Sequence, residues 1–155
     1  MSAAAAIREL TITRIYDAPR ELVFRAFTDP QHIAKWWGPK DFTNVVRAWE
    51  AKKGGRIDLD MIAPDGNGHP MGGTIHEVSP PNRFVFTSTA FWEADGTPGI
   101  ENYNTVTFED LGGKTRMTLH CQVLRASPAI KPALDGMEQG WNQSLDRLGD
   151  LVSQR

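Results

Sequence analysis

Acid–base chemistry in this chain would fall first to His76 and Glu77, which are adjacent in the sequence. A histidine titrates near neutral pH, so it can take up and release a proton under physiological conditions. Residues 71–78 are predicted to form a strand, and neighbouring residues of a strand point to opposite faces. If Val78 faces inward, so does His76, whereas an inward-facing Ile75 takes Glu77 inside with it. The pair can act in one pocket only if a bulge intervenes, and a non-catalytic role is favoured for both.

Metal binding and thiol chemistry are the other candidates, and the sequence favours neither. His32, His69 and His120 fall on a helix surface, in a turn and on the polar face of a strand. None of them pairs with another at metal-ligand spacing, so no metal site is predicted. Cys121 is the single cysteine and lies on an apolar strand face, which is typical of a buried, unreactive thiol. We therefore expect no catalytic residue, no metal and no cofactor; enzymatic activity stays an open question with a preference against it.

The composition limits the partners of the chain. Its 155 residues carry 17 basic and 19 acidic side chains, a net charge of −2. This balance gives no electrostatic attraction to nucleic acid or to an anionic membrane. No apolar stretch approaches the roughly 20 residues of a membrane-spanning helix, and the apolar start is too short for a signal peptide. A single cysteine suits a reducing compartment, so we expect a cytoplasmic protein.

The elements that would position these residues are predicted to be strands joined by tight turns. Residues 10–15 alternate in the manner of a first strand. Two short helices follow, one from Pro19 to Asp29 and one from Gln31 to Trp37, where prolines favour a start and a stop. The remaining strands are expected at residues 42–50, 56–62, 71–78, 83–92, 102–109 and 115–124. Short strands at regular spacing predict an antiparallel meander.

The end of the chain changes its apolar period from two residues to between three and four. Met137, Trp141, Leu145 and Leu148 recur at helical spacing, which places them on one stripe of a helix over residues 137–152. Each strand has one apolar and one polar face, as in a sheet that is covered on one side. The long helix is the expected cover. The predicted fold is therefore α+β, with a curved antiparallel sheet of about six or seven strands wrapped on a long C-terminal helix.

A sheet of this width is too wide for one helix to fill, so we expect a cavity between the two. By strand phase Asn104 and Asn102 both face this interior, provided that no bulge intervenes. Trp36 and Trp37 either line the mouth of the cavity or pack structurally, and Trp141 serves as core or as cavity wall. The side chains predicted to line the cavity are Phe27, Trp36, Trp37, Leu59, Met61, His76, Phe86, Ser88, Asn104, Val106, Met117, Leu119, Met137, Trp141 and Leu145.

Three segments of the sequence together resemble a known family. They read APRELVFRAFTDP with IAKWWGP shortly after it, EAKKGG, and GWNQSLDRL. Over residues 8–152, nearly the whole chain, the sequence is similar to bacterial proteins related to the C-terminal domain of the activator of heat-shock protein 90 ATPase. These belong to the START-like (SRPBCC, birch-pollen-allergen) superfamily. The resemblance implies a helix-grip fold in a single domain, residues 1–155. Glu50 and Lys52 stand where relatives often carry Asp and Arg, a departure that preserves charge.

Members of this family share a fold but no single substrate, so the resemblance predicts architecture better than activity. The leading hypothesis is the binding of a small, mostly hydrophobic molecule, because the expected interior is rich in Phe, Met and Trp with few polar groups. An alternative is a cyclase- or hydrolase-like enzyme for a polyketide-like or other lipophilic substrate, which would need His76, Glu77 or Asn104 inside the pocket. A third is a stress-related, co-chaperone-like interaction module. A chaperone partner is not expected, because no companion N-terminal domain accompanies the segment, and the sequence leaves a homodimer open.

Overall fold

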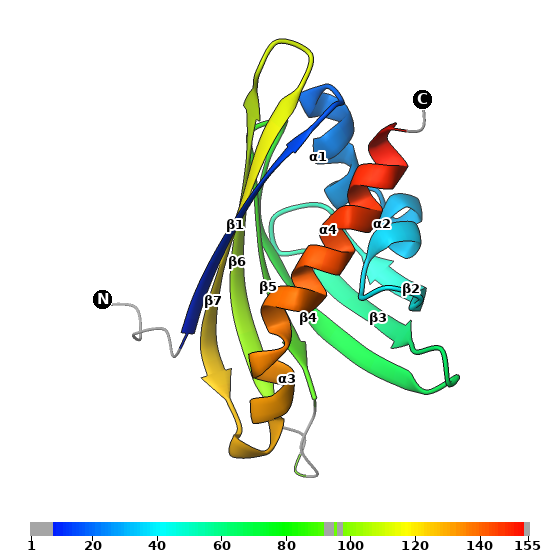
Figure 1. Cartoon of the computed structure of the whole chain (residues 1–155). Helices are drawn as coiled ribbons and strands as arrows, with labels where there is room; N and C mark the ends of the chain where they lie inside the picture. The colour runs from blue at the N-terminus through cyan, green and yellow to red at the C-terminus, as the bar shows by residue number, and fades with distance from the viewer. Residues whose placement is uncertain (1–7, 92–94, 96–97, 154–155) are drawn as a thin grey trace, which may run out of the picture.

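The chain forms an antiparallel sheet that curves around its last helix (Figure 1). A computed structural model describes residues 8–91, 95 and 98–153. In this part of the chain the sheet has seven strands in the order β1-β7-β6-β5-β4-β3-β2. The strands are β1 (Arg8–Tyr16), β2 (Thr43–Trp49), β3 (Arg56–Ile62), β4 (Gly68–Ser79), β5 (Arg83–Ala90), β6 (Ile100–Asp110) and β7 (Thr115–Ala126). The arrangement confirms the α+β, helix-grip fold expected from the sequence.

The first strand of the sheet pairs with the last one. Arg8 lies opposite Val123, and Tyr16 lies opposite Thr115. The other neighbours in the sheet follow one another in the sequence, as the turn-rich spacing predicts. As a result β1 and β2 are the two edges, and the chain between them must cross the open concave face.

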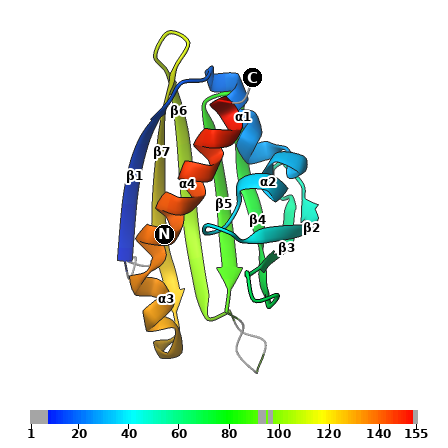
Figure 2. The same cartoon turned by 45° about the vertical axis from the view of Figure 1, so that its right-hand side comes forward.

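That crossing is made by α1 (Arg20–Thr28) and α2 (Pro30–Trp36). Asp29 separates them: its carboxylate accepts a hydrogen bond from the backbone N–H of Gln31 at 2.9 Å, and Pro30 occupies the first position of α2. A proline fits there because its missing N–H would have no partner in the helix. Both helices lie beside the last helix over the concave side of the sheet (Figure 2).

The chain ends in η1 (Pro128–Ile130), α3 (Lys131–Asp135) and α4 (Met137–Ser153). α4 starts at the residue predicted from its apolar stripe and runs one residue further than expected. It crosses the concave face diagonally (Figure 1) and buries Leu145 and Leu148 against the sheet. The hydroxyl of Tyr16 donates a hydrogen bond to the carbonyl oxygen of Leu145 at 2.8 Å, which joins the edge strand β1 to this helix. No helix in the described ranges is long and apolar enough to cross a membrane.

Aromatic side chains fill the end of the sheet that α1 and α2 cover. Phe27 packs edge-on against Trp36, with ring centroids 4.9 Å apart, a geometry that the quadrupoles of aromatic rings favour. The indole N–H of Trp36 donates to the carbonyl oxygen of Ala26, and that of Trp49 donates to the carbonyl oxygen of Phe27, both at 2.8 Å. These bonds satisfy polar groups that burial would otherwise leave unpaired. This end of the interior is therefore solid core.

Arg147 of α4 ties the last helix to the end of α2. Its guanidinium donates hydrogen bonds to the backbone carbonyl oxygens of Lys35, Trp37, Gly38 and Pro39, at 2.9 to 3.1 Å. The carbonyl end of a helix carries partial negative charge, so a cation is stabilising there. Partial burial lowers the pKa of the Arg147 guanidinium. The contact fixes the position of residues 37–39 relative to α4.

The strand bounds differ from the expected ones mainly around β4 and β5. β4 begins at Gly68, so His69 is part of a strand and not of the preceding turn. β4 also contains a bulge between Ile75 and Glu77. β5 ends at Ala90, and Trp92, the last residue of the expected strand, lies outside the described residues.

Candidate functional site

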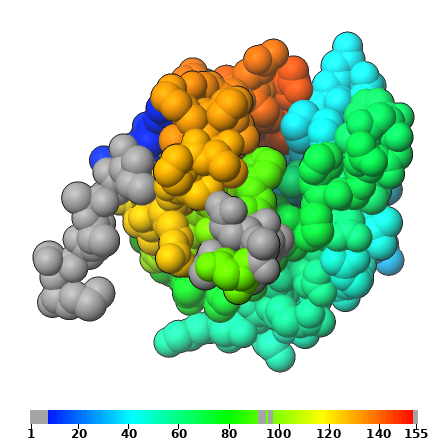
Figure 3. Space-filling model, turned by 90° about the horizontal axis from the view of Figure 1, so that it is seen from below, coloured from blue at the N-terminus to red at the C-terminus, as the bar shows by residue number. Residues whose placement is uncertain are grey.

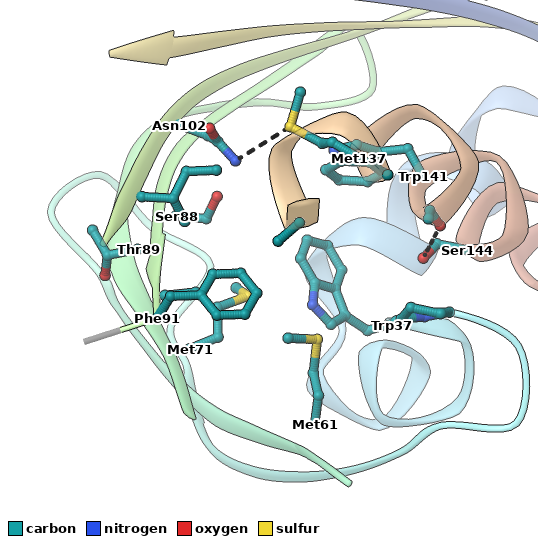
Figure 4. Close-up of a pocket in the computed structure, with 17 residues that line it drawn as sticks. Trp37, Met61, Met71, Ser88, Thr89, Phe91, Asn102, Met137, Trp141 and Ser144 are labelled. Carbon is teal, nitrogen blue, oxygen red and sulfur yellow. Dashed lines mark hydrogen bonds between the residues drawn. The ribbon is translucent and has the colours of Figure 1, made fainter. Parts of the chain in front are cut away.

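A pocket of about 230 Å³ opens between the start of α4, residues 37–39 and the ends of β3 to β6. Figure 4 shows its walls, and Figure 3 looks onto this end of the molecule, where the orange residues of α3 and α4 face the green strands. Its large apolar lining residues are Trp37, Met61, Met71, Phe91, Ile100, Met137 and Trp141. Its polar lining residues are Ser88, Thr89, Asn102 and Ser144. None of the lining residues that the structure describes carries a charge.

Trp37 forms the wall between the pocket and the aromatic core. It packs edge-on against Trp141 with centroids 5.4 Å apart, and it contacts Trp36 and Trp49 at similar distances. Only 5% of Trp37 is exposed. Because its neighbours and the Arg147 contact both hold it, Trp37 presents a fixed apolar surface to the pocket.

Methionines and glycines shape the rest of the pocket. Met61, Met71 and Met137 come from three different elements and point toward the space that Trp37 closes (Figure 4). Methionine side chains are flexible and polarisable, so they adapt to ligands of varied shape. A Cβ atom added at Gly140 on α4 would meet nothing within 4 Å. The absence of a side chain at this position therefore leaves open space on the helix side of the pocket.

Polar side chains lie on the sheet side of the pocket. Ser88 of β5 is paired with Asn102 of β6, and Asn104 is the next residue of β6 on the same face. The amide nitrogen of Asn104 donates to the Ser88 hydroxyl at 3.1 Å. The amide nitrogen of Asn102 lies 4.0 Å from the sulfur of Met137 (Figure 4). The pocket thus combines apolar walls with one small polar cluster.

His76 and Glu77 lie on the opposite, outer face of the sheet. The His76 ring is hydrogen-bonded to the hydroxyl of Thr87 and stacks on Tyr103 with centroids 5.7 Å apart. Glu77 accepts hydrogen bonds from Ser79 at 2.8 Å and from Arg83 at 3.2 Å. Neither side chain lines the pocket.

The bulge in β4 explains this placement. Ile75 pairs with Phe86 and Val78 pairs with Phe84, so both apolar residues face the core. One extra residue between them, His76, restarts the alternation of the strand. Both alternatives derived from strict alternation were therefore wrong, because neither allows Ile75 and Val78 to point inward together.

The residues predicted to line the cavity fall into three groups. Trp37, Met61, Ser88, Met137 and Trp141 do line the pocket. Those that are buried in the core or beside the pocket without lining it are Phe27, Trp36, Leu59, Phe86, Asn104, Val106, Met117, Leu119 and Leu145. His76 is on the outer face. Strand phase chose the correct face for the strand residues other than His76, and it did not distinguish the solid end of the interior from the open one.

Several pocket residues were absent from the predicted set. Met71 and Asn102 have the correct strand phase, which was the available signal. Gly136, directly before α4, and Gly140 on α4 are four residues apart, and that spacing of small residues was a signal for space beside the helix. Phe91 directly follows β5, and no periodic pattern marks it.

Cys121 is buried and does not line the pocket. Burial raises the pKa of its thiol to about 12, and a hydrogen bond with Trp141 opposes this in smaller part. A thiol with so high a pKa is protonated and unreactive at neutral pH. Within the described residues, no cluster of three or more His, Cys, Asp or Glu side chains could hold a metal ion.

A curved sheet that grips a long C-terminal helix, with a pocket between them, defines a protein of the START-like, helix-grip class. A model of the family described as "Activator of Hsp90 ATPase homolog 1-like protein" matches residues 17–153. The chain belongs to this family, as its three sequence segments indicate. No curated protein matches the chain.

Solved structures of bacterial proteins share the fold. A protein from Chromobacterium violaceum is 30% identical, with a TM-score of 0.82 over 95% of this chain and 98% of the other. A protein from Arthrobacter aurescens is 22% identical, with a TM-score of 0.84 over 99% of this chain and 94% of the other. An AHSA1 protein from Silicibacter pomeroyi is 22% identical, with a TM-score of 0.78 over 94% and 98% of the two chains. The last two similarities support the fold alone.

Proposed function

We propose that the chain binds a small, mostly apolar molecule in the pocket between α4 and the sheet. The observation that carries this proposal is the lining: Trp37, Trp141 and three methionines surround a space that no described charged side chain enters. Ligand pockets characteristically combine apolar and aromatic walls with a few polar groups. Membership of this family, with its helix-grip fold, also supports ligand binding.

The volume of the pocket limits the size of the ligand. An apolar protein cavity of about 150 Å³ admits benzene. At about 230 Å³, this pocket has room for a substituted ring, a fused pair of rings or an aliphatic group of similar size. Larger molecules would exceed this volume.

The enzymatic alternative has less support than binding. General acid–base catalysis requires a titratable side chain within hydrogen-bond reach of the reacting group. The candidates His76 and Glu77 lie on the outer face, and of the three residues named for this role only Asn104 is inside. An amide does not titrate in the physiological range, so we do not propose a reaction.

Nuclear magnetic resonance titration with indole and naphthalene tests the binding proposal. We expect the indole N–H signals of Trp37 and Trp141 and the methyl signal of Met137 to shift with increasing probe. Signals from the β6–β7 turn around Leu111, at the other end of the sheet, should not move. The proposal is contradicted if no saturable shifts appear, or if the shifts centre on residues outside the pocket.

A pair of variants on α4 gives a matched control. Gly140→Leu places a side chain in the open space beside the helix, so it should abolish the shifts. Gln139→Leu adds the same side chain at the neighbouring, exposed position and should leave probe binding unchanged. Equal binding by both variants would show that the probes bind elsewhere.

A further inference from the structure

Three polar side chains meet on this face of the sheet: Ser88 and Asn102 line the pocket, and Asn104 lies beside them in the interior. Ser88 and Asn102 are directly paired across β5 and β6, and Asn104 lies one step further along the same face. Asn104 is fully buried and Ser88 is 8% exposed. Polar groups this deeply buried need hydrogen-bond partners to offset the loss of water.

The orientation of the Asn104 amide is set by its neighbours. Its nitrogen lies 3.4 Å from the carbonyl oxygen of Phe86 and 3.1 Å from the Ser88 hydroxyl. A carbonyl oxygen can only accept a hydrogen bond, so the NH₂ group must face Phe86. The side-chain oxygen of Asn104 therefore points the other way, and it has no hydrogen-bond partner among the described residues.

Ser88 and Asn102, at the pocket wall, also have hydrogen-bonding groups without a partner. Ser88 accepts from Asn104, so its own hydroxyl hydrogen remains free to donate. The nitrogen of Asn102 contacts the Met137 sulfur, and its buried side-chain oxygen has no partner within the described part of the chain. Both Ser88 and Asn102 line the pocket. At the pocket wall one acceptor, the Asn102 oxygen, and one donor, the Ser88 hydroxyl, are thus available on one side of an otherwise apolar space.

The polar groups of the pocket are uncharged. None of the described lining residues is acidic or basic, so a charged ligand group would lose its hydration without gaining an ion pair. A neutral hydroxyl or N–H group would instead give the Asn102 oxygen the donor that it lacks. A hydroxyl could also accept from Ser88.

We propose that Ser88 and Asn102, with Asn104 positioning Ser88, form a subsite that binds a hydroxyl or N–H group on an uncharged, otherwise apolar ligand. The inference rests on the proposed function, because it names the ligand chemistry of the same pocket. A cluster with a purely structural role would use its acceptors within the protein. Here the side-chain oxygen of Asn102, a residue of the pocket wall, is buried and has no partner within the described part of the chain.

Matched pairs of probes test the subsite in the full chain. Phenol and toluene differ by one hydroxyl, and indole and indene by one N–H, with little change in size. A donor group costs affinity when it enters an apolar site unpaired, because it leaves its hydration behind. With the subsite present, phenol and indole should bind at least as tightly as toluene and indene in calorimetric or NMR titrations.

Two variants, one at Ser88 and one at Asn102, separate the subsite from general effects on the pocket. Ser88→Ala and Asn102→Leu should each weaken phenol and indole binding about tenfold and leave toluene and indene within roughly twofold. Ser144→Ala is the control, because Ser144 also lines the pocket but its hydroxyl already donates to the Gly140 carbonyl oxygen at 3.1 Å. It should alter neither member of a pair.

The possible results separate this inference from the proposed function. Binding of toluene and indene with much weaker binding of phenol and indole overturns the subsite and leaves the pocket proposal standing. Equal losses for both members in Ser88→Ala and Asn102→Leu overturn it as well. If no member of either pair binds, the proposed function fails and the subsite with it. Should a variant fail to fold, the side-chain amide signals of Asn102 and Asn104 in the wild-type chain decide: they should shift with phenol and not with toluene, and equal shifts overturn the subsite.

Discussion

The guanidinium of Arg147 lies 3.1 Å from the carbonyl oxygen of Trp37, more than a hundred residues earlier in the chain. The same guanidinium reaches three further carbonyl oxygens at the end of α2. One side chain of the last helix therefore holds a wall of the pocket in place. The third family segment, GWNQSLDRL, supplies both Trp141 and Arg147. Trp141 lines the pocket, and Arg147 holds Trp37 on the facing wall.

Replacing Arg147 with lysine should lower stability and weaken probe binding together. A lysine ammonium is a compact point charge and cannot spread its donors over four carbonyl oxygens as the planar guanidinium does. We expect a loss of about 1–2 kcal/mol in the free energy of unfolding, measured by urea denaturation, and weaker binding of naphthalene. Arg116→Lys is the control, because Arg116 makes an exposed ion pair with Glu109, and such pairs contribute little. Equal effects of the two changes would argue against a special role for Arg147.

Gly140→Ala should stabilise the protein. Glycine within a helix costs about 0.5–1 kcal/mol relative to alanine, and an added Cβ at this position meets nothing within 4 Å. The gain should appear as a higher midpoint in urea denaturation, and benzene-sized probes should still bind because one methyl group fills little of the pocket. A destabilised Gly140→Ala variant would mean that the space beside α4 is smaller than described.

Gly55→Ala should have the opposite effect. A Cβ atom at Gly55 would lie 1.7 Å from the carbonyl oxygen of Glu50. The backbone of this segment also pairs with β4, since the Gly55 carbonyl oxygen accepts from the N–H of Ile75 at 2.8 Å. The segment cannot move away without breaking that bond, so we expect a loss of about 3 kcal/mol. Gly68→Ala, where the nearest atom would be an Ile62 methyl at 3.5 Å, should cost far less in the same denaturation experiment.

Cys121 should react with thiol reagents only when the protein unfolds, and it should make stability depend on alkaline pH. Its pKa rises from 9.0 to about 12 on folding, mainly through burial. A raised pKa in the folded state contributes stability that is fully present below the unfolded value. That contribution is lost as pH rises from about 9 towards 12. Urea denaturation at pH 8 and pH 10 should show a larger loss for the wild type than for Cys121→Ala, and identical losses would disprove the linkage.

Much of the fold was predictable from the sequence because its periods are regular. The stripe from Met137 to Val152 repeats at helical spacing, and Asp29 with Pro30 marks a helix boundary by local chemistry alone. The bulge at His76 was not predictable in this way. It inserts one residue into a two-residue period, and only the pairing of both flanking residues with β5 reveals it.

The pocket was harder to predict than the face of the sheet on which it lies. Leu59 and Met61 are on the same face of β3, yet Leu59 is fully buried in core while Met61 lines the pocket. What separates them is which end of the sheet α1 and α2 cover. The covered end depends on how the helices cross the strands, and the alternation of residues within a strand does not indicate that crossing.

The pairing of β1 with β7 also has a consequence for synthesis. Residues 8–16 find their partners only when residues 115–123 have been made, and Arg147 reaches residues 37–39 later still. Pairings this distant in sequence fold slowly, because a long loop must close before the contacts form. Until then a growing chain on the ribosome exposes the apolar face of an unfinished sheet. The pocket and the complete sheet should therefore form together, once β7 and α4 are available, and not in stages.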